Sequence, residues 1–306
     1  MVIGMPSTKT NQAKSKTQII EEILEPWVPP VLMGLLYDVK SFIAYQKFHC
    51  LIKNNIDLKN IHYNERCFII GSGPSIKKQD LRPLRDEIVI PLNNFYVHPD
   101  FQEIMSGHCP KYYLTAPLHP PKTRNIWVKW LADISTYVPE HTKMIFGVNG
   151  YVDSAASIIK ENNFFPENEI YWYLPTDRHI DKYGFSQRFI DIIQPVMISG
   201  TASVYALMFA TYMGFKEIYL LGLDHSSICS KISSREVRFY SNALHQKEEK
   251  PPARINTFLN HRNIFLQYES IKNCTESKIL NLSHSSLLDV FEFERIETIL
   301  KQTSSF

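Results

Sequence analysis

The stretch Arg66-Cys-Phe-Ile-Ile-Gly-Ser-Gly-Pro-Ser75 decides the fold that this sequence predicts. Cys67–Ile70 is a short apolar run with β-branched residues that ends at a glycine, a pattern typical of a buried parallel strand. Gly71 and Gly73 permit a tight turn and a close backbone approach, and Pro74 suits the first turn of a following helix. A strand, a glycine turn and a helix start together direct backbone N–H groups toward a phosphate or a nucleotide. A simple connection between a strand and a helix has the same pattern, so both interpretations stay open.

This glycine turn matches neither of two common phosphate-binding fingerprints. No third glycine follows at the spacing of a dinucleotide-binding loop. Lys77 and Lys78 lack the preceding glycine and the following serine or threonine of a P-loop. The sequence therefore indicates a nucleotide site without specifying the nucleotide.

Length, charge and cysteine content restrict the class of protein. A chain of 306 residues suits one large α/β domain with additions. The net charge of +2, with basic residues spread along the chain, argues against a nucleic-acid-binding protein. The 5 cysteines are scattered and show no CxxC spacing, which argues against a disulfide framework or a zinc site and for a reducing cytoplasm. The polar first 18 residues do not resemble a signal peptide.

The N-terminal 60 residues differ from the rest of the chain. Residues 1–18 are rich in Ser, Thr, Lys, Asn and Gln and are predicted to be disordered. Ile19–Trp27 and Val31–Ile52 have helical spacing, so residues 19–60 form a predicted helical extension. We expect these helices to dock on the main domain. The alternative is peripheral membrane association through residues 19–52, at the inner face of the membrane.

From residue 61 to 306, predicted strands and helices alternate as in βαβ units. This pattern predicts an α/β fold with a Rossmann-like, mostly parallel sheet and helices on both faces. The polar stretch near 228–252 is a predicted lid that orders on ligand binding. The predicted strands cover residues 67–70, 87–92, 111–115, 143–148, 169–174, 217–221 and 278–282. The predicted helices cover residues 127–137, 152–162 and 256–273, with another that begins at Ser199-Gly200-Thr201 and ends at Gly214.

Polar residues follow two other predicted strands. Asn93 and Asn94 come after the second strand, and Gly222, Asp224 and His225 follow the strand that ends at residue 221. Ligands in open α/β sheets bind at the carboxyl ends of the strands, so these residues are candidates for a binding site. Turn capping would also explain the two asparagines and the aspartate. For the histidine, three roles stay open: a base, a phosphate ligand or an ordinary hydrogen-bonded residue.

Four segments carry a family resemblance, namely Gly71–Ser75, Asn93-Asn94, Gly214–His225 and Leu287–Phe291. They resemble the 6-hydroxymethylpterin diphosphokinase-like (MptE-like) domain family over roughly residues 60–295. More distantly, the chain is similar to bacterial lipooligosaccharide sialyltransferases, which use a CMP-activated sugar.

The sialyltransferase resemblance implies a role for each matching residue. The glycine turn would hold the phosphate and ribose, the two asparagines the base or ribose, and Asp224 a sugar or ribose hydroxyl. His245, in the predicted lid, is the nearest counterpart of the catalytic histidine. The implied nucleotide-binding residues are Gly71, Ser72, Gly73, Ser75, Asn93, Asn94, Ser199, Gly200, Thr201, Gly222 and Asp224.

Two positions depart from the sialyltransferase pattern. His225 and Ser226 follow the aspartate where those enzymes have an aromatic pair. Ala116 stands where they carry a substrate-contacting asparagine. The resemblance therefore does not extend to sialic acid as the sugar.

An inverting sugar transfer needs a base near neutral pKa, and histidine is the natural choice. The catalytic candidates are His245, His225 and Asp224. Arg238, Tyr240 and the helix start at residues 199–201 could stabilise the departing phosphate. We find no DxD-like acidic pair at a strand end, so we expect no metal site and no required cofactor.

Three functions follow from these observations. The favoured one is an inverting glycosyltransferase that moves a sugar from a nucleotide donor, CMP-linked by resemblance, to a surface-glycan acceptor. The first alternative is a diphosphokinase that needs ATP and Mg²⁺, with Asp224 and either Asp177 or Asp181 as metal ligands. The second is a non-catalytic nucleotide-binding scaffold whose N-terminal helices recruit partners. A further polar loop at residues 176–186 could close over an anionic ligand or lie on the solvated surface.

Overall fold

The computed structural model describes residues 28–119, 122–150, 153–176, 190–228, 238–240 and 254–301. The strands pair in the orders β10-β9-β8-β1-β2 and β3-β4-β5, with a short β6–β7 pair beside them. Isolated bridges from Val89 to Lys111 and from Leu92 to Leu114 connect β2 to β3. All of these pairings are parallel, which confirms the predicted sheet. The strands are β1 (Arg66–Ile70), β2 (Ile88–Pro91), β3 (Tyr112–Leu114), β4 (Lys143–Gly147), β5 (Ile170–Tyr173), β6 (Pro175–Thr176), β7 (Val196–Met197), β8 (Glu217–Leu221), β9 (Lys278–Asn281) and β10 (Glu292–Phe293).

The strand order reverses at β1. From β1 the chain proceeds through β2, β3, β4 and β5 on one side, and it then returns to place β8 against the other side of β1. Connections therefore leave β1 and β8 in opposite directions at their carboxyl ends. This is the topological switch point at which open α/β sheets bind ligands.

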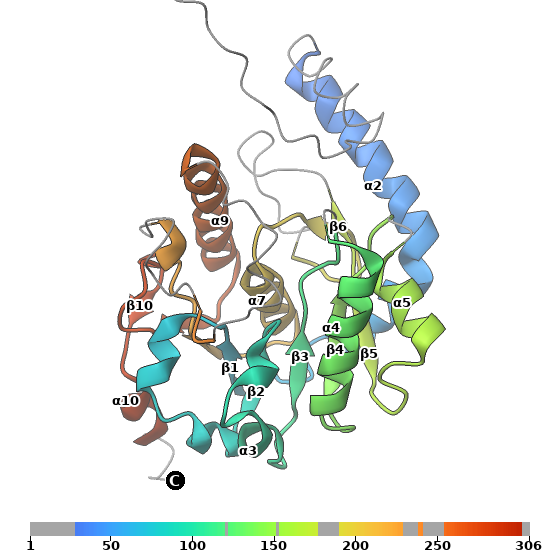
Figure 1. The fold of residues 1–306 in the computed structure, drawn as a ribbon. Helices are drawn as coiled ribbons and strands as arrows, with labels where there is room; N and C mark the ends of the chain where they lie inside the picture. Colours follow the sequence, from blue (N-terminus) through green and yellow to red (C-terminus); the bar gives the residue numbers. More distant parts are fainter. Residues whose placement is uncertain are drawn as a thin grey trace, which may run out of the picture.

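Helices cover both faces of the sheet (Figure 1). In β1, Cys67 and Ile69 belong to a core cluster shared with α7 and α9, whereas Phe68 and Ile70 belong to a second cluster shared with α3, α4 and α5. Such alternation, with both sets buried, is what a strand between two helical layers requires. The helices are α2 (Pro30–Ile52), α3 (Phe101–Met105), α4 (Arg124–Tyr137), α5 (Ala155–Asn162), α7 (Ala202–Tyr212), α9 (Arg254–Cys274) and α10 (Ile296–Lys301), with short 3₁₀ helices at Lys53–Leu58, Pro74–Lys78, Arg82–Asp86, Phe95–Val97 and Ser226–Ile228.

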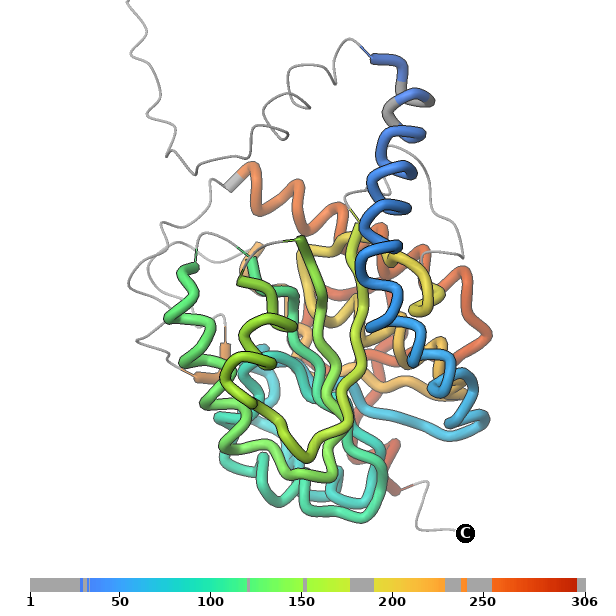
Figure 2. Tube along the Cα trace, turned by 90° about the vertical axis from the view of Figure 1, so that its right-hand side faces the viewer, coloured from blue at the N-terminus to red at the C-terminus, as the bar shows by residue number. Residues whose placement is uncertain are grey.

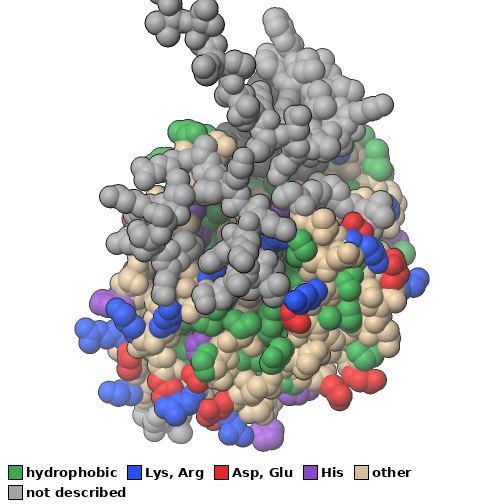
Figure 3. All heavy atoms as spheres, in the orientation of Figure 1, with side chains coloured by type: hydrophobic (Ala, Val, Ile, Leu, Met, Phe, Trp, Pro, Cys, Tyr) green, Lys and Arg blue, Asp and Glu red, His purple; other side chains and the backbone are tan. Residues whose placement is uncertain are grey.

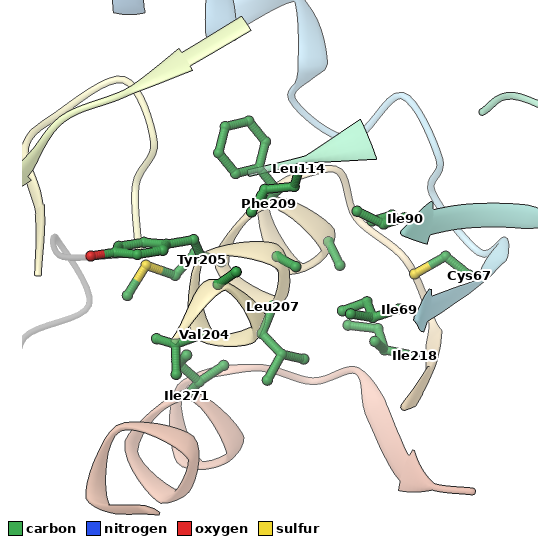
Figure 4. Packing of buried hydrophobic residues seen from close by; sticks show 14 of the residues in the cluster. Cys67, Ile69, Ile90, Leu114, Val204, Tyr205, Leu207, Phe209, Ile218 and Ile271 are labelled. Atoms are coloured by element: carbon green, nitrogen blue, oxygen red, sulfur yellow. The ribbon is translucent and has the colours of Figure 1, made fainter. Parts of the chain in front are cut away.

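Helix α7 lies in the middle of the first cluster. All of its residues from Ala202 to Ala210 are buried, as its small and apolar side chains predict. Figure 4 shows Val204 and Leu207 directed toward Ile271 of α9, while Phe209 lies beside a strand. Gly214 follows the helix with φ +83, which confirms the predicted left-handed terminator.

Two local predictions were wrong, and several short elements were not predicted. The helix expected after the glycine turn is only a 3₁₀ helix, Pro74–Lys78. Helix α5 begins at Ala155 instead of residue 152, because the Ser154 side chain caps it by accepting a hydrogen bond from the N–H of Ser157. The short helix α3 and the strands β6, β7 and β10 were not predicted, since two to five residues carry little periodic signal.

The second N-terminal helix is confirmed as α2, Pro30–Ile52. Its lower part lies beside β5, and its upper end extends past the sheet (Figure 2). The 3₁₀ helix Lys53–Leu58 that follows contains the fully buried Asn55, whose Nδ2 donates to the carbonyl oxygens of Trp172 and Ile192, both at 2.7 Å. The predictions for residues 1–27 lie outside the described residues. Within the described ranges, no helix combines the length and hydropathy needed to cross a bilayer.

Charged side chains are mixed on the visible surface. On the face shown in Figure 3, the described lysine and arginine side chains are interspersed with aspartate and glutamate. This distribution fits the small net charge of +2. It gives this face no single-sign field of the kind that steers nucleic acid.

Candidate functional site: a polar cleft at the ends of β1 and β8

A cleft of about 150 Å³ opens at the switch point of the sheet. It gathers residues from the ends of β1, β2 and β8, from the start of α7 and from the segment 238–240. Three segments that the sequence singled out therefore meet in one place. The lining residues are Gly71, Ser72, Gly73, Leu92, Asn93, Thr201, Ala202, Ser203, Gly222, Leu223, Asp224, His225, Ser226, Ser227 and Arg238.

The glycines allow the ends of β1 and β8 to touch. The N–H groups of Gly71 and Gly73 donate to the carbonyl oxygens of Leu221 and Gly222, each at 2.7 Å. A Cβ atom on Gly71 would lie 2.5 Å from the oxygen of Gly222, and one on Gly73 would lie 2.5 Å from Oδ2 of Asp224. The sequence predicted that a ligand would approach this turn closely. In the structure the end of β8 takes that place, and the N–H groups of Gly71 and Gly73 are already hydrogen-bonded to it.

Asp224 anchors this turn from the other strand. The side chain is buried, and its Oδ2 accepts a hydrogen bond of 2.8 Å from the N–H of Ser75. Its backbone oxygen accepts from the N–H of Leu287 at 2.9 Å. The second carboxylate oxygen, Oδ1, is buried without a hydrogen-bond partner among the residues that the structure describes. Asp224 therefore holds the site together, and one of its oxygens keeps its capacity to accept.

The two adjacent asparagines have different surroundings. Asn93 lines the cleft with φ +51, and its Oδ1 accepts from the N–H of Ala116 at 2.8 Å. Its amide NH₂ is thereby the group left for a ligand. Asn94 is buried outside the lining, where its Oδ1 accepts from the indole N–H of Trp130 and its Nδ2 donates to the hydroxyl of Tyr240 at 2.8 Å. Asn94 therefore holds the Tyr240 hydroxyl in place.

Residues 238–240 of the predicted lid are described, and they lie against the cleft. The N–H of Phe239 donates to the carbonyl oxygen of Ser72 at 2.9 Å. The Tyr240 hydroxyl accepts from Asn94 and, at 2.9 Å, from Nη1 of Arg238. With two hydrogen bonds accepted, this hydroxyl keeps its own proton to donate. The guanidinium of Arg238 lines the cleft.

His225 lies at the rim with left-handed backbone, φ +50. Burial of the ring, together with the nearby His261, lowers the pKa of His225 to about 4. The imidazole is therefore neutral at physiological pH. Its Nε2 lies 3.1 Å from the Tyr268 hydroxyl, which leaves Nδ1 outside that hydrogen bond.

A chain of hydroxyl groups connects His225 back to the start of α7. The Tyr268 hydroxyl lies 2.5 Å from Oγ of Ser203, which lies 2.8 Å from Oγ1 of Thr201. Tyr268 is fully buried, and this burial raises its pKa above the ordinary value. Sequence reasoning missed both residues, since Ser203 within the apolar helix α7 and Tyr268 at a helical core spacing in α9 look like packing residues.

The remaining predicted residues lie near the cleft but outside its lining. Ser75 is buried behind the turn, with its N–H bound to Asp224. The Ser199 Oγ accepts from the N–H of Thr201 at 3.3 Å, and Gly200 packs against Asn260 of α9. The predictions for His245 and for residues 177–186 lie outside the described residues. Within those ranges, no group of three or more His, Cys, Asp or Glu side chains is arranged to hold a metal ion.

Comparison with known proteins gives one structural likeness. No protein-family model matches the chain, so the resemblance to the diphosphokinase-like domain family gains no support there. No curated protein matches it either. Among solved structures, the chain is similar to the monofunctional α-2,3-sialyltransferase Cst-I from Campylobacter jejuni, with a TM-score of 0.44 and 15% identity. The match covers 75% of this chain and 80% of that chain, a level of similarity that does not assign a function.

Proposed function

We propose that this protein is a glycosyltransferase of the inverting, sialyltransferase-like kind, with a nucleotide-activated and CMP-linked sugar as its donor and a glycan as its acceptor. One observation carries the proposal: the ends of β1, β2 and β8 and the start of α7 bring their polar groups to one cleft at the switch point of a parallel sheet. The residue roles drawn from the sialyltransferase resemblance concern this same set of segments.

The charge in the cleft favours a donor with a single phosphate. Arg238 is the one lysine or arginine among the described lining residues, and Asn93, Thr201 and Ser203 supply neutral hydrogen-bonding groups. One guanidinium with neutral donors matches the single negative charge on the phosphodiester of a CMP-linked sugar. A nucleoside triphosphate carries several charges and needs Mg²⁺ held by carboxylates. Among the described lining residues, Asp224 is the one carboxylate that could hold Mg²⁺, and one of its oxygens already accepts a hydrogen bond from the N–H of Ser75.

The described cleft suits part of the donor. Its volume of about 150 Å³ is below the ~300 Å³ at which small-molecule sites begin. We therefore assign the ribose and phosphate to it, with the sugar extending toward His225 and Arg238. No resident metal or cofactor is part of the proposal.

In the proposed reaction, the acceptor hydroxyl attacks the anomeric carbon while the bond from that carbon to the phosphate oxygen breaks. The phosphate leaves with the electron pair, and Arg238 and Tyr240 stabilise it by donating hydrogen bonds. A neutral His225 can take the acceptor proton on Nδ1 when its Nε2–H donates to Tyr268. A bound phosphate beside the ring would raise its pKa toward the working range. His245 stays the second candidate for this base.

Nucleotide binding tests the proposal directly. Thermal unfolding is followed with CMP, CDP, UDP, ATP and GTP, each with and without Mg²⁺. We expect CMP to stabilise the protein without metal, by ~2.7 kcal/mol at 100 times its Kd, or roughly 4–5 °C in Tm. Stabilisation by ATP that depends on Mg²⁺ would favour the diphosphokinase. No response to any nucleotide would reject the donor site and leave a scaffold that binds no nucleotide.

Release of CMP then tests the chemistry. The protein is incubated with a panel of CMP-linked sugars, with and without glycan acceptors, and free CMP is measured. We expect release above the uncatalysed rate, and a lower rate for Arg238→Gln. If CMP binds but no CMP-linked sugar is turned over with any acceptor, the catalytic half of the proposal fails.

A further inference from the structure

Helix α2 presents a continuous apolar stripe to solvent. Single exposed apolar residues are normal on protein surfaces, but a contiguous group of large ones marks an interaction surface. The stripe extends over three turns of the helix, and none of its members is charged. Its members, with their exposed fractions, are Leu32 51%, Leu35 56%, Leu36 54%, Val39 56%, Phe42 61% and Ile43 64%.

Most of the stripe faces away from the described part of the α/β domain, while Phe42 at its edge lines a cavity of about 290 Å³ with Thr176, Gln194 and Pro195. The opposite side of α2 packs against the core through the partly buried Ala44, Tyr45 and Phe48. Figures 1 and 2 show the helix at the edge of the molecule, with its upper end beyond the sheet. A partner that binds the stripe would therefore not collide with the α/β domain.

The spacing of the stripe identifies the kind of partner. Leu32, Leu36, Val39, Ile43, Gln46 and Cys50 follow one another at steps of four and three residues, and all six are exposed. This is the period of 3.5 residues that aligns the core positions of a coiled coil. A helix lying on a lipid surface needs an apolar face but not this period. We propose that α2 pairs in parallel with α2 of a second copy of this chain.

The lysines beside the stripe favour the parallel orientation. Lys40 and Lys47 take the positions that flank one side of the seam, while Leu35 and Phe42 flank the other. In a parallel pair, each lysine lies against an apolar residue of the second helix, and its methylene stem covers that residue. In an antiparallel pair, lysines of the two helices would meet and repel each other.

The exposed area sets the expected strength. The six large side chains, each with about half of its surface exposed, offer on the order of 600 Å² per protomer, against ~800 Å² per partner in a stable interface. We therefore expect a dimer that dissociates on dilution.

Cys50 provides a direct test, since a parallel pair brings the two copies of this exposed core-position residue together. The full chain is oxidised with copper phenanthroline and analysed on a non-reducing gel. We expect a disulfide-linked dimer that Cys50→Ser abolishes. A dimer that persists in Cys50→Ser, or no dimer in the wild-type chain, would overturn the parallel pairing.

Sedimentation of the non-oxidised protein gives the second measurement. We expect wild-type dimerisation that increases with concentration and is lost in the double variant Val39→Glu, Ile43→Glu with an unchanged Tm. Ile56→Glu is the matched control, because Ile56 is 51% exposed but lies outside α2, and it should still dimerise.

If a membrane or another part of this chain covers the stripe, the same experiments give different results. A chain that is monomeric at every concentration and floats with anionic vesicles would assign the stripe to a membrane surface. A monomer in which the double variant lowers the Tm would indicate that the chain's own N-terminal residues cover it. Either result rejects the dimer, and neither bears on the proposed glycosyltransfer.

Discussion

The two carboxylate oxygens of Asp224 differ in their hydrogen bonding. One oxygen accepts from Ser75 N–H, and the other is buried without a described partner. Asp224→Ala leaves that N–H unsatisfied, at a cost of ~1–3 kcal/mol, and we expect a Tm lower by roughly 2–5 °C. Asp224→Asn keeps an acceptor oxygen and should lose less.

The contrast between these two variants also separates structure from binding. If the proposed role in the donor site is right, CMP binding is lost in Asp224→Ala and weakened in Asp224→Asn. Equal Tm values for wild type and Asp224→Ala, measured by circular dichroism, would mean that the carboxylate does not anchor the turn.

His225 should make stability depend on pH. Its pKa in the folded protein is about 4, below the ordinary 6.5, so between these values the unfolded chain binds a proton that the folded chain does not. Stability therefore increases with pH across this window and is lost as pH falls from 6.5 toward 4. His225→Asn removes the titrating group, and asparagine tolerates the backbone φ of +50.

Urea unfolding at several pH values checks this expectation. The wild-type protein should lose more stability between pH 6.5 and 4 than His225→Asn does. Identical pH slopes for the two proteins would show that the ring is not buried as described.

At the scale of the elements, the contact between the ends of β1 and β8 leaves no room for a side chain on its glycines. Gly73→Ala would place a Cβ 2.5 Å from Asp224, so the strand ends must separate, at a cost of ~1–3 kcal/mol. Gly150→Ala is the matched control, because a Cβ there has no neighbour within 4 Å. We expect Gly73→Ala alone to lower the Tm and weaken CMP binding. Equal effects of the two substitutions would contradict the described contact.

The sequence predicts an element well when the element carries its own boundary signals. β8 was predicted with its observed bounds, Glu217–Leu221, since an apolar run lies between two glycines. The prediction of a helix after Gly73 was wrong. Glycine followed by proline indicates that a helix can start there, but no residue nearby determines how long the helix is. Here the chain reaches β2 after two short 3₁₀ helices.

Within the candidate site, sequence could identify strand ends but not the direction of each side chain. Asn93 and Asn94 are neighbours with the same chemistry, yet one lines the cleft and the other binds Trp130 and Tyr240. The difference depends on where α4 lies, which is a property of the tertiary fold. For the same reason Tyr268, a residue of α9, gave no sign that it connects Ser203 to His225.

At the scale of the whole molecule, the reversal of strand order at β1 explains why one cleft collects distant segments. Ser75 and Asp224 are 149 positions apart in the chain and share a hydrogen bond. Residues of β2, α7 and the segment 238–240 reach the same place from other directions. The proposed donor site is thus a property of the folded domain, and no short segment of the chain contains it.

This arrangement has a consequence for synthesis on the ribosome. Until residues 217–221 have emerged, β1 has no neighbour on one side, and its N–H and C=O groups form an open edge. The nascent chain must therefore carry a hydrophobic strand with one open edge through about half of its translation, a state that favours aggregation or chaperone capture. The late arrival of β8 closes that edge and creates the cleft in the same event.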